Sequence, residues 1–327
     1  MRNAKHDATS SDINGAFNGP SGLTRRSFLG MAGPVSLGWA LARHLPASAA
    51  GSVSPFPDTA LQPSGSKPRP MIAVQLYSVR QECQRDLDAA LEQVAAMGFE
   101  GVEFAGYFKY VERASELKSR LDALKLKAAG THIRLGTLQG DALKSTIDFH
   151  QTIGCRFLIV PGDTAFTDPE KSKALADTFN QLAATLKPLG MACGYHNHVG
   201  EFRKDGDKTY WDLFAERTGP DVILQQDCGW TLAAGFDPVA YIRKYPGRTR
   251  TTHFKPMVRE GETGKKAILG QDSADWSAIY AACTSVGGTE WVVVEQEIYP
   301  DGKTPMECTR ESLAGLRKLL ELSRTEG

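Results

Sequence analysis

Alternation between short apolar runs and longer amphipathic runs is the feature that most constrains the fold of this chain. From residue 71 onward, β-branched stretches alternate with helical patterns. The expected strands are 72–76, 101–104, 127–131, 157–160, 192–196, 222–226, 251–254 and 291–294. Strands that are separated by helices pair in parallel through right-handed crossovers. Eight such units in about 250 residues are the size of a closed (β/α)8 barrel.

The helical patterns carry their own start and stop signals. They lie near 86–97, 111–124, 141–153, 171–189, 210–217, 238–244, 276–286 and 306–322. The first is the clearest, because Asp86 and Asp88 stand in its first turn and Gly98 follows its end. An open doubly wound sheet is the main alternative. It is disfavoured because no G-x-G-x-x-G motif follows the first strand, which runs into QLYS at 75–78.

The first 49 residues have the features of an export signal. TRRSFL at 24–29 holds a twin-arginine pair, a modestly apolar run extends to Ala42, and ASA at 47–49 is a small-residue cleavage site. A membrane anchor is the alternative, but glycine and proline interrupt the run, which is shorter than the ~20 apolar residues that a span needs. We therefore expect export by the twin-arginine machinery, no stable membrane span, and a periplasmic or secreted protein.

These boundaries predict a simple domain organisation. Residues 1–49 are the signal, 50–70 form a Ser/Pro/Gly-rich flexible leader, and 71–327 form one barrel domain. Twin-arginine substrates generally fold in a reducing cytoplasm before they cross, so the six cysteines should be mostly free and buried. They show no C-x-x-C spacing, which makes a zinc knuckle unlikely.

The charge composition argues against nucleic acid as a partner. Lys+Arg and Asp+Glu number 38 each, and no long block of like charge interrupts this balance. Because affinity for a phosphate backbone depends on clustered cations, nucleic-acid binding is disfavoured. A small-molecule substrate is the expected partner.

Polar residues fall where a barrel of this kind places its chemistry, at the C-terminal ends of its strands. Six expected strands end in such residues: Glu103, His132, His196 with His198, Asp227, His253 with Lys255, and Glu295 with Glu297. Of the five histidines beyond residue 49, only His150 lies elsewhere. Polar ends that converge from six strands indicate a site.

Several of these residues also have a structural interpretation. His132 is compatible with a hydrogen-bonded core histidine, Glu103 with a helix cap, and Lys255 with a solvated loop cation. Asp227 and Glu295 are harder to explain in this way, because each follows an apolar strand where an unpaired charge would be costly. Two carboxylates and a histidine at neighbouring strand ends suit one divalent ion such as Mn²⁺, Co²⁺, Zn²⁺ or Mg²⁺.

The chain resembles the xylose isomerase-like TIM barrel superfamily, the sugar phosphate isomerase/epimerase group that also contains apurinic endonucleases and inosose dehydratases. The segments that carry the resemblance are, in order, IAVQLYSVR, GFEGVEFAGYF, YHNHVGEF, QQDCGW, THFKPM and VVVEQE. In that superfamily one metal is commonly held by Glu, Asp, His and Glu after strands five to eight. The resemblance assigns Asp227, His253 and Glu295 to the last three positions.

The strand-five position departs from this pattern, because Gly194 stands where the family glutamate is expected. Alternate residues of a strand point to the same side, so His196 is the natural replacement ligand. Family epimerases use two glutamates as bases, so an epimerase here would need His132, Glu103 or His198 instead. A β-elimination next to a keto group needs only a base and an acid. Glu295 or a histidine would take the α-proton, the metal and Lys255 would hold the enolate, and a second histidine would protonate the leaving oxygen.

We therefore expect a metal-dependent enzyme that isomerises or epimerises a free or keto sugar through an enediolate. A 3-keto-glycoside lyase or dehydratase is the alternative. A non-catalytic sugar-binding barrel stays open because the strand-five glutamate is missing, whereas charge, export and too few histidines disfavour an apurinic endonuclease. The expected catalytic residues are Glu295, His132, Glu103 and Lys255. The expected ligands are His196, Asp227, His253 and Glu295, and the expected substrate contacts are His198, Glu201, Trp230, Tyr77 and Glu297.

Overall fold

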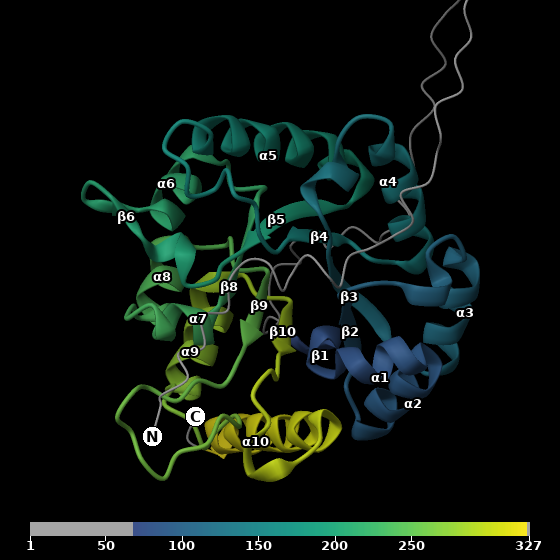
Figure 1. Ribbon diagram of the computed structural model, residues 1–327, viewed down its shortest axis with the longest axis vertical. Helices are drawn as coiled ribbons and strands as arrows, with labels where there is room; N and C mark the ends of the chain where they lie inside the picture. The colour runs from purple at the N-terminus through teal and green to yellow at the C-terminus, as the bar shows by residue number, and fades with distance from the viewer. Residues whose placement is uncertain (1–67, 326–327) are drawn as a thin grey trace, which may run out of the picture.

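Eight parallel strands close into a barrel in the computed structural model, which describes residues 68–325 (Figure 1). The strands are β1 (Met71–Gln75), β2 (Gly101–Phe104), β3 (Lys127–His132), β4 (Phe157–Val160), β5 (Ala192–His196), β8 (Ile223–Asp227), β9 (Thr251–Phe254) and β10 (Trp291–Val294). Each pairs with the strand before and after it, and β10 closes on β1. The predicted (β/α)8 barrel is confirmed, with every strand within one residue of its expected bounds.

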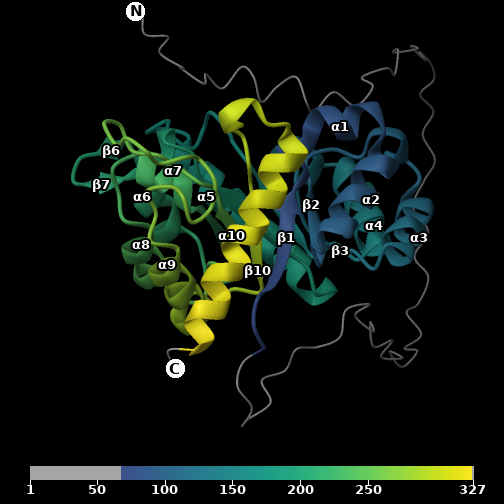
Figure 2. The same ribbon diagram turned by 90° about the horizontal axis from the view of Figure 1, so that it is seen from below.

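A ring of helices covers the outside of the barrel (Figures 1 and 2). The helices are α1 (Arg80–Arg85), α2 (Leu87–Met97), α3 (Ala114–Ala123), α4 (Ala142–Ile153), α5 (Ser172–Leu186), α6 (Tyr210–Arg217), α7 (Cys228–Ala233), α8 (Pro238–Lys244), α9 (Trp276–Ala282) and α10 (Pro305–Thr325). Single turns of other helix types occur at Leu76–Val79, Phe108–Tyr110, Leu135–Leu138, Lys187–Leu189, Gly200–Phe202, Cys283–Gly287 and Pro300–Gly302. The long α10 packs against β10 and the turn after β1.

Local sequence explains the best-predicted helix. The Asp86 carboxylate accepts hydrogen bonds from the backbone N–H groups of Asp88 and Ala89, and Gly98 ends α2 in the left-handed region at φ 92°. A cap of this kind stabilises a helix by about 1 kcal/mol. The buried face of α2, formed by Leu87, Ala90, Leu91, Val94 and Met97, packs into the layer between helices and strands.

Three elements are absent from the sequence prediction. They are α1, α7 and a small antiparallel hairpin of β6 (Lys204–Asp205) and β7 (Lys208–Thr209). The two helices have only six residues each, too few for apolar periodicity to show. Of these, α7 matters most, because it begins directly after Asp227 and is capped by that carboxylate.

The barrel interior changes character along its axis. Small and apolar side chains fill part of it, namely Ala73, Ala129, Phe157, Ile159, Ala192, Ile223, Trp291 and Val293. Toward the C-terminal strand ends the buried side chains become polar, with Gln75, Glu103, Gln225 and His253 all fully buried. Because each of these groups needs a partner in the interior, the top of the barrel must contain a polar network.

Other expectations concern the whole chain. The six cysteines are all free and buried, as predicted. Within residues 68–325, no helix is both long and apolar enough to cross a membrane. The predicted export signal, 1–49, lies outside the described residues, as does the leader except for residues 68–70.

Candidate active site

The four predicted ligands meet at the C-terminal ends of adjacent strands. His196, Asp227, His253 and Glu295 each offer one ligand atom, and these atoms lie within 4.8 Å of one another. Asp227 Oδ2 is 3.8 Å from both His196 Nε2 and His253 Nδ1. His253 Nδ1 is 2.9 Å from Glu295 Oε2. All four side chains are buried, so the cluster lies inside the barrel mouth.

Asp227 supplies the observation that tests whether this cluster fits a metal. Its Oδ1 accepts a hydrogen bond from the Trp230 backbone N–H at 2.7 Å. Its Oδ2 is buried and has no hydrogen-bond partner. A buried oxygen left in this state costs about 1–3 kcal/mol. Two imidazole nitrogens and two carboxylates around it form a donor set that suits a divalent ion, so the residues fit such an ion.

Charges within the cluster are strongly coupled. Burial raises the pKa of Asp227 to about 7, an effect that Lys255 opposes and Glu295 reinforces. Burial lowers the pKa of His253, but Glu103 and Glu295 outweigh this effect and raise it to about 10. The pKa of Glu295 lies below its usual range because Lys255 and His253 outweigh the opposing effect of burial. The metal-free cluster therefore holds its charge as an imidazolium between carboxylates, a position that a divalent cation can take over.

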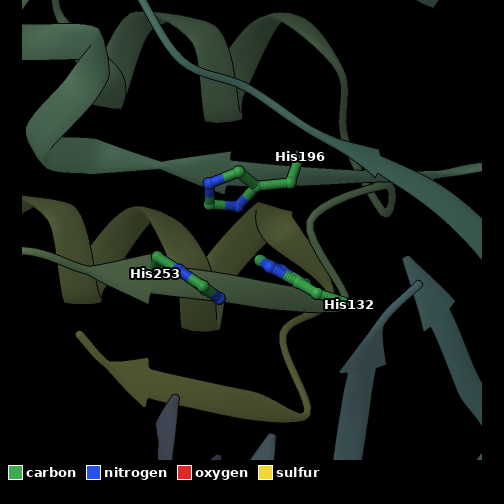
Figure 3. Close-up of side chains that lie close together, drawn as sticks. All are labelled: His132, His196 and His253. Atoms are coloured by element: carbon green, nitrogen blue, oxygen red, sulfur yellow. The ribbon is translucent and has the colours of Figure 1, made fainter. Parts of the chain in front are cut away.

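A second layer of polar groups lies against the first. Figure 3 shows the rings of His132, His196 and His253 close together. The His132 and His253 rings are stacked and His196 lies at a steep angle to both, with ring centroids 4.5 to 5.1 Å apart. Gln225 Oε1 lies 2.7 Å from His132 Nε2 and 3.0 Å from His196 Nδ1. Glu103 accepts from Gln225 Nε2 at 2.7 Å and bonds His253 Nε2. Glu103 therefore does not cap a helix but lies among the histidines.

The three histidines also have nitrogens close enough to share an ion. At each ring, however, a nitrogen already bonds Gln225 or Glu103. The interpretation of His132 as a hydrogen-bonded core histidine thus agrees with its contacts. The orphan oxygen of Asp227 distinguishes the His196, Asp227, His253 and Glu295 set as the better metal site.

Lys255 lies beside the ligand cluster and is not a solvated loop cation. It is 4% exposed. Its Nζ is 2.6 Å from Glu297 Oε2, 3.6 Å from Glu295 Oε2 and 4.3 Å from the ring centroid of Trp230. This places a buried ammonium where it can stabilise negative charge that develops next to Glu295.

The other predicted substrate contacts lie in different surroundings. The His198 ring lies near those of His196 and Trp230, and burial, with help from Lys255, lowers its pKa to about 3. His198 is therefore neutral at neutral pH. Glu201 instead holds the loop after β5, because it accepts from the His198 N–H at 2.8 Å and from the Tyr195 hydroxyl at 3.4 Å. Tyr77 lies in the turn after β1, with the Arg80 guanidinium 4.4 Å from its ring centroid.

Most of the barrel matches a known protein family. Residues 91–319 match the family described as xylose isomerase-like TIM barrel. The chain belongs to this family.

Relatives of this xylose isomerase-like barrel include proteins named as dehydratases and as sugar phosphate isomerases or epimerases. The inosose dehydratase of Geobacillus kaustophilus is 23% identical over 65% of this chain and 80% of that protein. The rhizopine catabolism protein MocC of Rhizobium meliloti is 25% identical over 71% of this chain and 81% of its own. A solved sugar phosphate isomerase/epimerase from Parabacteroides distasonis is 28% identical, covers 76% of this chain and 98% of its own, and has a TM-score of 0.64. The family thus includes lyase and isomerase relatives.

The strand-five position of this xylose isomerase-like barrel has no room for a side chain. A Cβ on Gly194 would stand 2.5 Å from the Ile223 carbonyl oxygen and 2.6 Å from the Ile223 Cβ. Gly194 pairs with Ile223, whereas His196 pairs with Gln225 further along the strand. The side chain that reaches the ligand cluster from β5 is therefore that of His196.

Two polar residues that shape the site are missing from the predicted set. Gln225 shares its face of β8 with Asp227, two residues on, and strand alternation is the signal that identifies it. Asn197 accepts from the Asp227 N–H at 2.9 Å through Oδ1 and donates to the Asp227 carbonyl at 3.3 Å through Nδ2. Asn197 thus fixes the backbone of a predicted ligand, a role that no sequence pattern indicates.

Proposed function

We propose that this chain is a divalent-metal-dependent enzyme that removes the proton next to the keto group of a sugar and then expels a β-oxygen substituent. The substrate class is a 3-keto-glycoside or a related keto polyol. The observation that carries the proposal is the unpartnered Oδ2 of Asp227 between His196, His253 and Glu295, with the Lys255 ammonium beside Glu295. Relatives named inosose dehydratase support an elimination.

The number of available bases favours elimination over epimerisation. An epimerase must remove a proton on one face of the carbon and return one on the other. Position 194 has no space for the second glutamate. Glu103 is fully buried and already accepts from Gln75, Gln225 and His253. Glu295 is therefore the main base that the site offers.

Each residue then has a defined part in the proposed reaction. A divalent ion held by His196, Asp227, His253 and Glu295 would supply Lewis-acid polarisation of the substrate carbonyl. Glu295 accepts the α-proton, and the electron pair passes into an enolate whose charge Lys255 stabilises. The carbon–carbon double bond forms as the β C–O bond breaks, and Glu295 returns its proton to the departing oxygen. The products are an unsaturated ketone and a free alcohol.

This scheme revises the expectation that a second histidine protonates the leaving oxygen. Burial lowers the pKa of both His132 and His198. A neutral imidazole is a poor proton donor, because giving up its N–H would leave an imidazolate. His198 and Trp230 are better placed to orient substrate hydroxyls near Lys255.

Isomerisation or epimerisation is the second candidate. It is favoured by the 28% identity to the Parabacteroides distasonis sugar phosphate isomerase/epimerase over nearly all of that chain. Both reactions begin with the same proton abstraction, and they differ in whether a C–O bond then breaks. In a non-catalytic sugar-binding barrel the orphan oxygen of Asp227 would accept a hydrogen bond from a sugar hydroxyl, so the experiment has to separate binding from turnover.

The test separates these outcomes in one experiment. The purified full chain, loaded with Mn²⁺ or Co²⁺, is incubated in D₂O with methyl 3-keto-glucoside and followed by NMR. Metal-dependent release of methanol supports elimination. Deuterium at the α-carbon with the methyl group retained supports isomerase or epimerase chemistry. The absence of both changes supports a binding protein. Asp227→Asn should abolish the reaction, whereas the matched control Asp212→Asn, on α6, should not.

We also propose export to the periplasm or beyond, on the strength of the TRRSFL segment and the ASA cleavage site. Replacing the pair by Arg25→Lys with Arg26→Lys should retain the uncleaved chain in the cytoplasm. Cell fractionation and the mass of the N-terminal peptide measure this. Export that continues unchanged in the double variant would rule out the twin-arginine route.

A further inference from the structure

We infer that Glu103 is a positioning residue that holds an N–H on Nε2 of His253 directly and on Nδ1 of His196 through Gln225, and so turns the opposite nitrogen of each ring toward the metal site. The inference rests on the proposed metal site, but it concerns residues of the chain alone. It assigns Glu103 a role different from the catalytic one that the sequence predicts.

Glu103 is a buried hydrogen-bond acceptor whose partners must all be donors. It is 0% exposed. Its Oε1 accepts from Gln225 Nε2 at 2.7 Å, and its Oε2 accepts from Gln75 Nε2 at 2.8 Å. Burial raises the pKa of Glu103, but His132 and His253 outweigh this effect and keep it below its usual range. An ionised carboxylate only accepts hydrogen bonds, so both glutamines must turn their amide nitrogens toward it.

The orientation of Gln225 then fixes two histidines. Since its Nε2 points to Glu103, its Oε1 faces the other way, 2.7 Å from His132 Nε2 and 3.0 Å from His196 Nδ1. A carbonyl oxygen only accepts, so both of these ring nitrogens carry hydrogen. The bond to Gln225 occupies Nδ1 of His196 and leaves Nε2 as its other ring nitrogen. His196 Nε2 is therefore the free nitrogen, and it is the one 3.8 Å from Asp227 Oδ2.

Glu103 fixes His253 directly. Its Oε2 bonds Nε2 of His253, so that nitrogen carries a hydrogen. Nδ1, on the other side of the ring, faces Glu295 Oε2 at 2.9 Å and Asp227 Oδ2 at 3.8 Å. A carboxylate that binds the second N–H of a ligand histidine is a common arrangement around metals. Here one carboxylate serves two ligand histidines, one directly and one through Gln225.

The surrounding backbone accommodates Glu103 closely. Gly130 on β3 pairs with Glu103 on β2. A Cβ at position 130 would lie 2.8 Å from Glu103 Oε1. The absence of a side chain at Gly130 thus leaves space for the carboxylate oxygen that receives the Gln225 amide.

Proton positions can be read directly from ¹⁵N-histidine-labelled full chain without metal, by long-range ¹H–¹⁵N correlation. We expect N–H on Nδ1 of His196, on Nε2 of His132, and on both nitrogens of His253, each of which faces a carboxylate oxygen. With Zn²⁺ added, His253 should keep the N–H on Nε2 and lose the one on Nδ1. Glu103→Gln should disturb these positions and weaken Zn²⁺ or Co²⁺ binding about 10- to 100-fold, the range typical of outer-shell partners, in competition with a chelating indicator. Gln225→Leu should weaken binding less, because His253 keeps its carboxylate. Glu100→Gln, on the loop before β2, is the matched control and should leave affinity unchanged.

Two results would overturn the inference: a proton on Nε2 of His196 in the wild type, or Glu103→Gln binding metal within about twofold of the wild type. Should Glu103→Gln fail to fold, the wild-type spectrum and Gln225→Leu still decide the matter. The outcome is separable from the proposed function. Expected proton positions and affinity losses in a protein that leaves keto sugars unchanged would refute the reaction but not the role of Glu103.

Discussion

Two neighbouring layers at the top of the barrel are similarly polar and similarly buried, yet they differ in how well their groups are paired. In the layer around Glu103, both carboxylate oxygens have donors from glutamine side chains. In the layer around Asp227, one carboxylate oxygen has none. Buried polar groups are normally satisfied, and a fully paired network makes a core rigid. The comparison indicates that the paired layer is a scaffold and the unpaired layer is the place for a ligand.

Burial without a partner is not sufficient by itself to mark a site. Glu82 Oε2, Arg120 Nε, the indole N–H of Trp211 and the hydroxyl of Thr309 are also buried without a hydrogen-bond partner. Among the described residues none of these four belongs to a group that could hold a metal, whereas the Asp227 carboxylate is surrounded by metal-binding side chains. Sites of this kind commonly sacrifice stability for function, which makes the difference between the layers measurable.

The largest expected effect comes from removing the charge of the unpaired carboxylate. Asp227→Asn keeps the size of the side chain but removes a ligand, so affinity for a divalent ion should fall by about 1,000-fold or more, beyond the loss typical of an outer partner. Metal-free stability at pH 8 should rise, because a buried unpaired charge is removed. Metal analysis and urea unfolding measure the two effects.

Asp212→Asn is the matched control for this substitution. Asp212 is also buried, but its Oδ1 accepts from Lys244 and Tyr245. Its replacement should lower stability and leave metal affinity unchanged. Equal metal affinity in wild type and Asp227→Asn would remove the distinction between the two layers.

The next expected effect is a pH dependence of the free energy of unfolding. Burial raises the pKa of Asp227 to about 7 in the folded, metal-free protein, against about 3.9 when unfolded. The folded state therefore holds this proton more tightly, and the stabilisation it provides is complete below about pH 4 and lost as pH rises through about 7. Relative to Asp227→Asn, the free energy of unfolding of the wild type should fall with pH, by at most about 1.4 kcal/mol per unit.

Urea unfolding of both proteins between pH 4.5 and 7.5, with metal chelated, supplies the comparison. Groups away from the cluster, His150 among them, titrate alike in both proteins, so the difference between the two curves reports Asp227 together with the groups coupled to it. Parallel curves over this window would mean that the carboxylate is not held in an unfavourable environment.

The third expected effect is the loss of stability caused by a side chain at Gly194, two residues before His196 on β5. Gly194→Ala should destabilise the protein by about 1–3 kcal/mol, as overpacking does, because the new Cβ meets the Ile223 backbone. Gly200→Ala is the control, since nothing lies within 4 Å of its Cβ position. Thermal unfolding measures both variants. If Gly194→Ala were as stable as Gly200→Ala, a side chain at position 194 would be possible and the case for His196 as the β5 ligand would weaken.

The convergence of His196, Asp227, His253 and Glu295 could be predicted from sequence, but the hydrogen-bond network around Glu103 could not. Apolar runs ending in Asp227, His253 and Glu295 locate strand ends, and a barrel brings those ends together. Alternation from Asp227 places Gln225 on the same face of the strand, but it does not show that Gln225 links Glu103 to His132 and His196. Gln226 instead donates to Thr231 at 2.8 Å. The role of Glu103 depends on its pairing with Gln75 and on its approach to His253, 150 residues away, which only the closed barrel reveals.

The smallest expected effect concerns a second unpaired group at the mouth, the buried indole N–H of Trp230. Its ring lies 4.3 Å from Lys255 Nζ. Trp230→Phe keeps an aromatic face there but removes the donor, so KM for the keto sugar should rise about fivefold, the equivalent of one hydrogen bond of about 1 kcal/mol, with metal affinity unchanged. Trp211→Phe removes an equally unpaired indole N–H from the aromatic packing of α6 against Phe166 and Phe202, and its KM should not change. An equal KM in both variants would mean that the N–H of Trp230, like that of Trp211, is unpaired through packing alone, and only Asp227 would then distinguish the ligand layer.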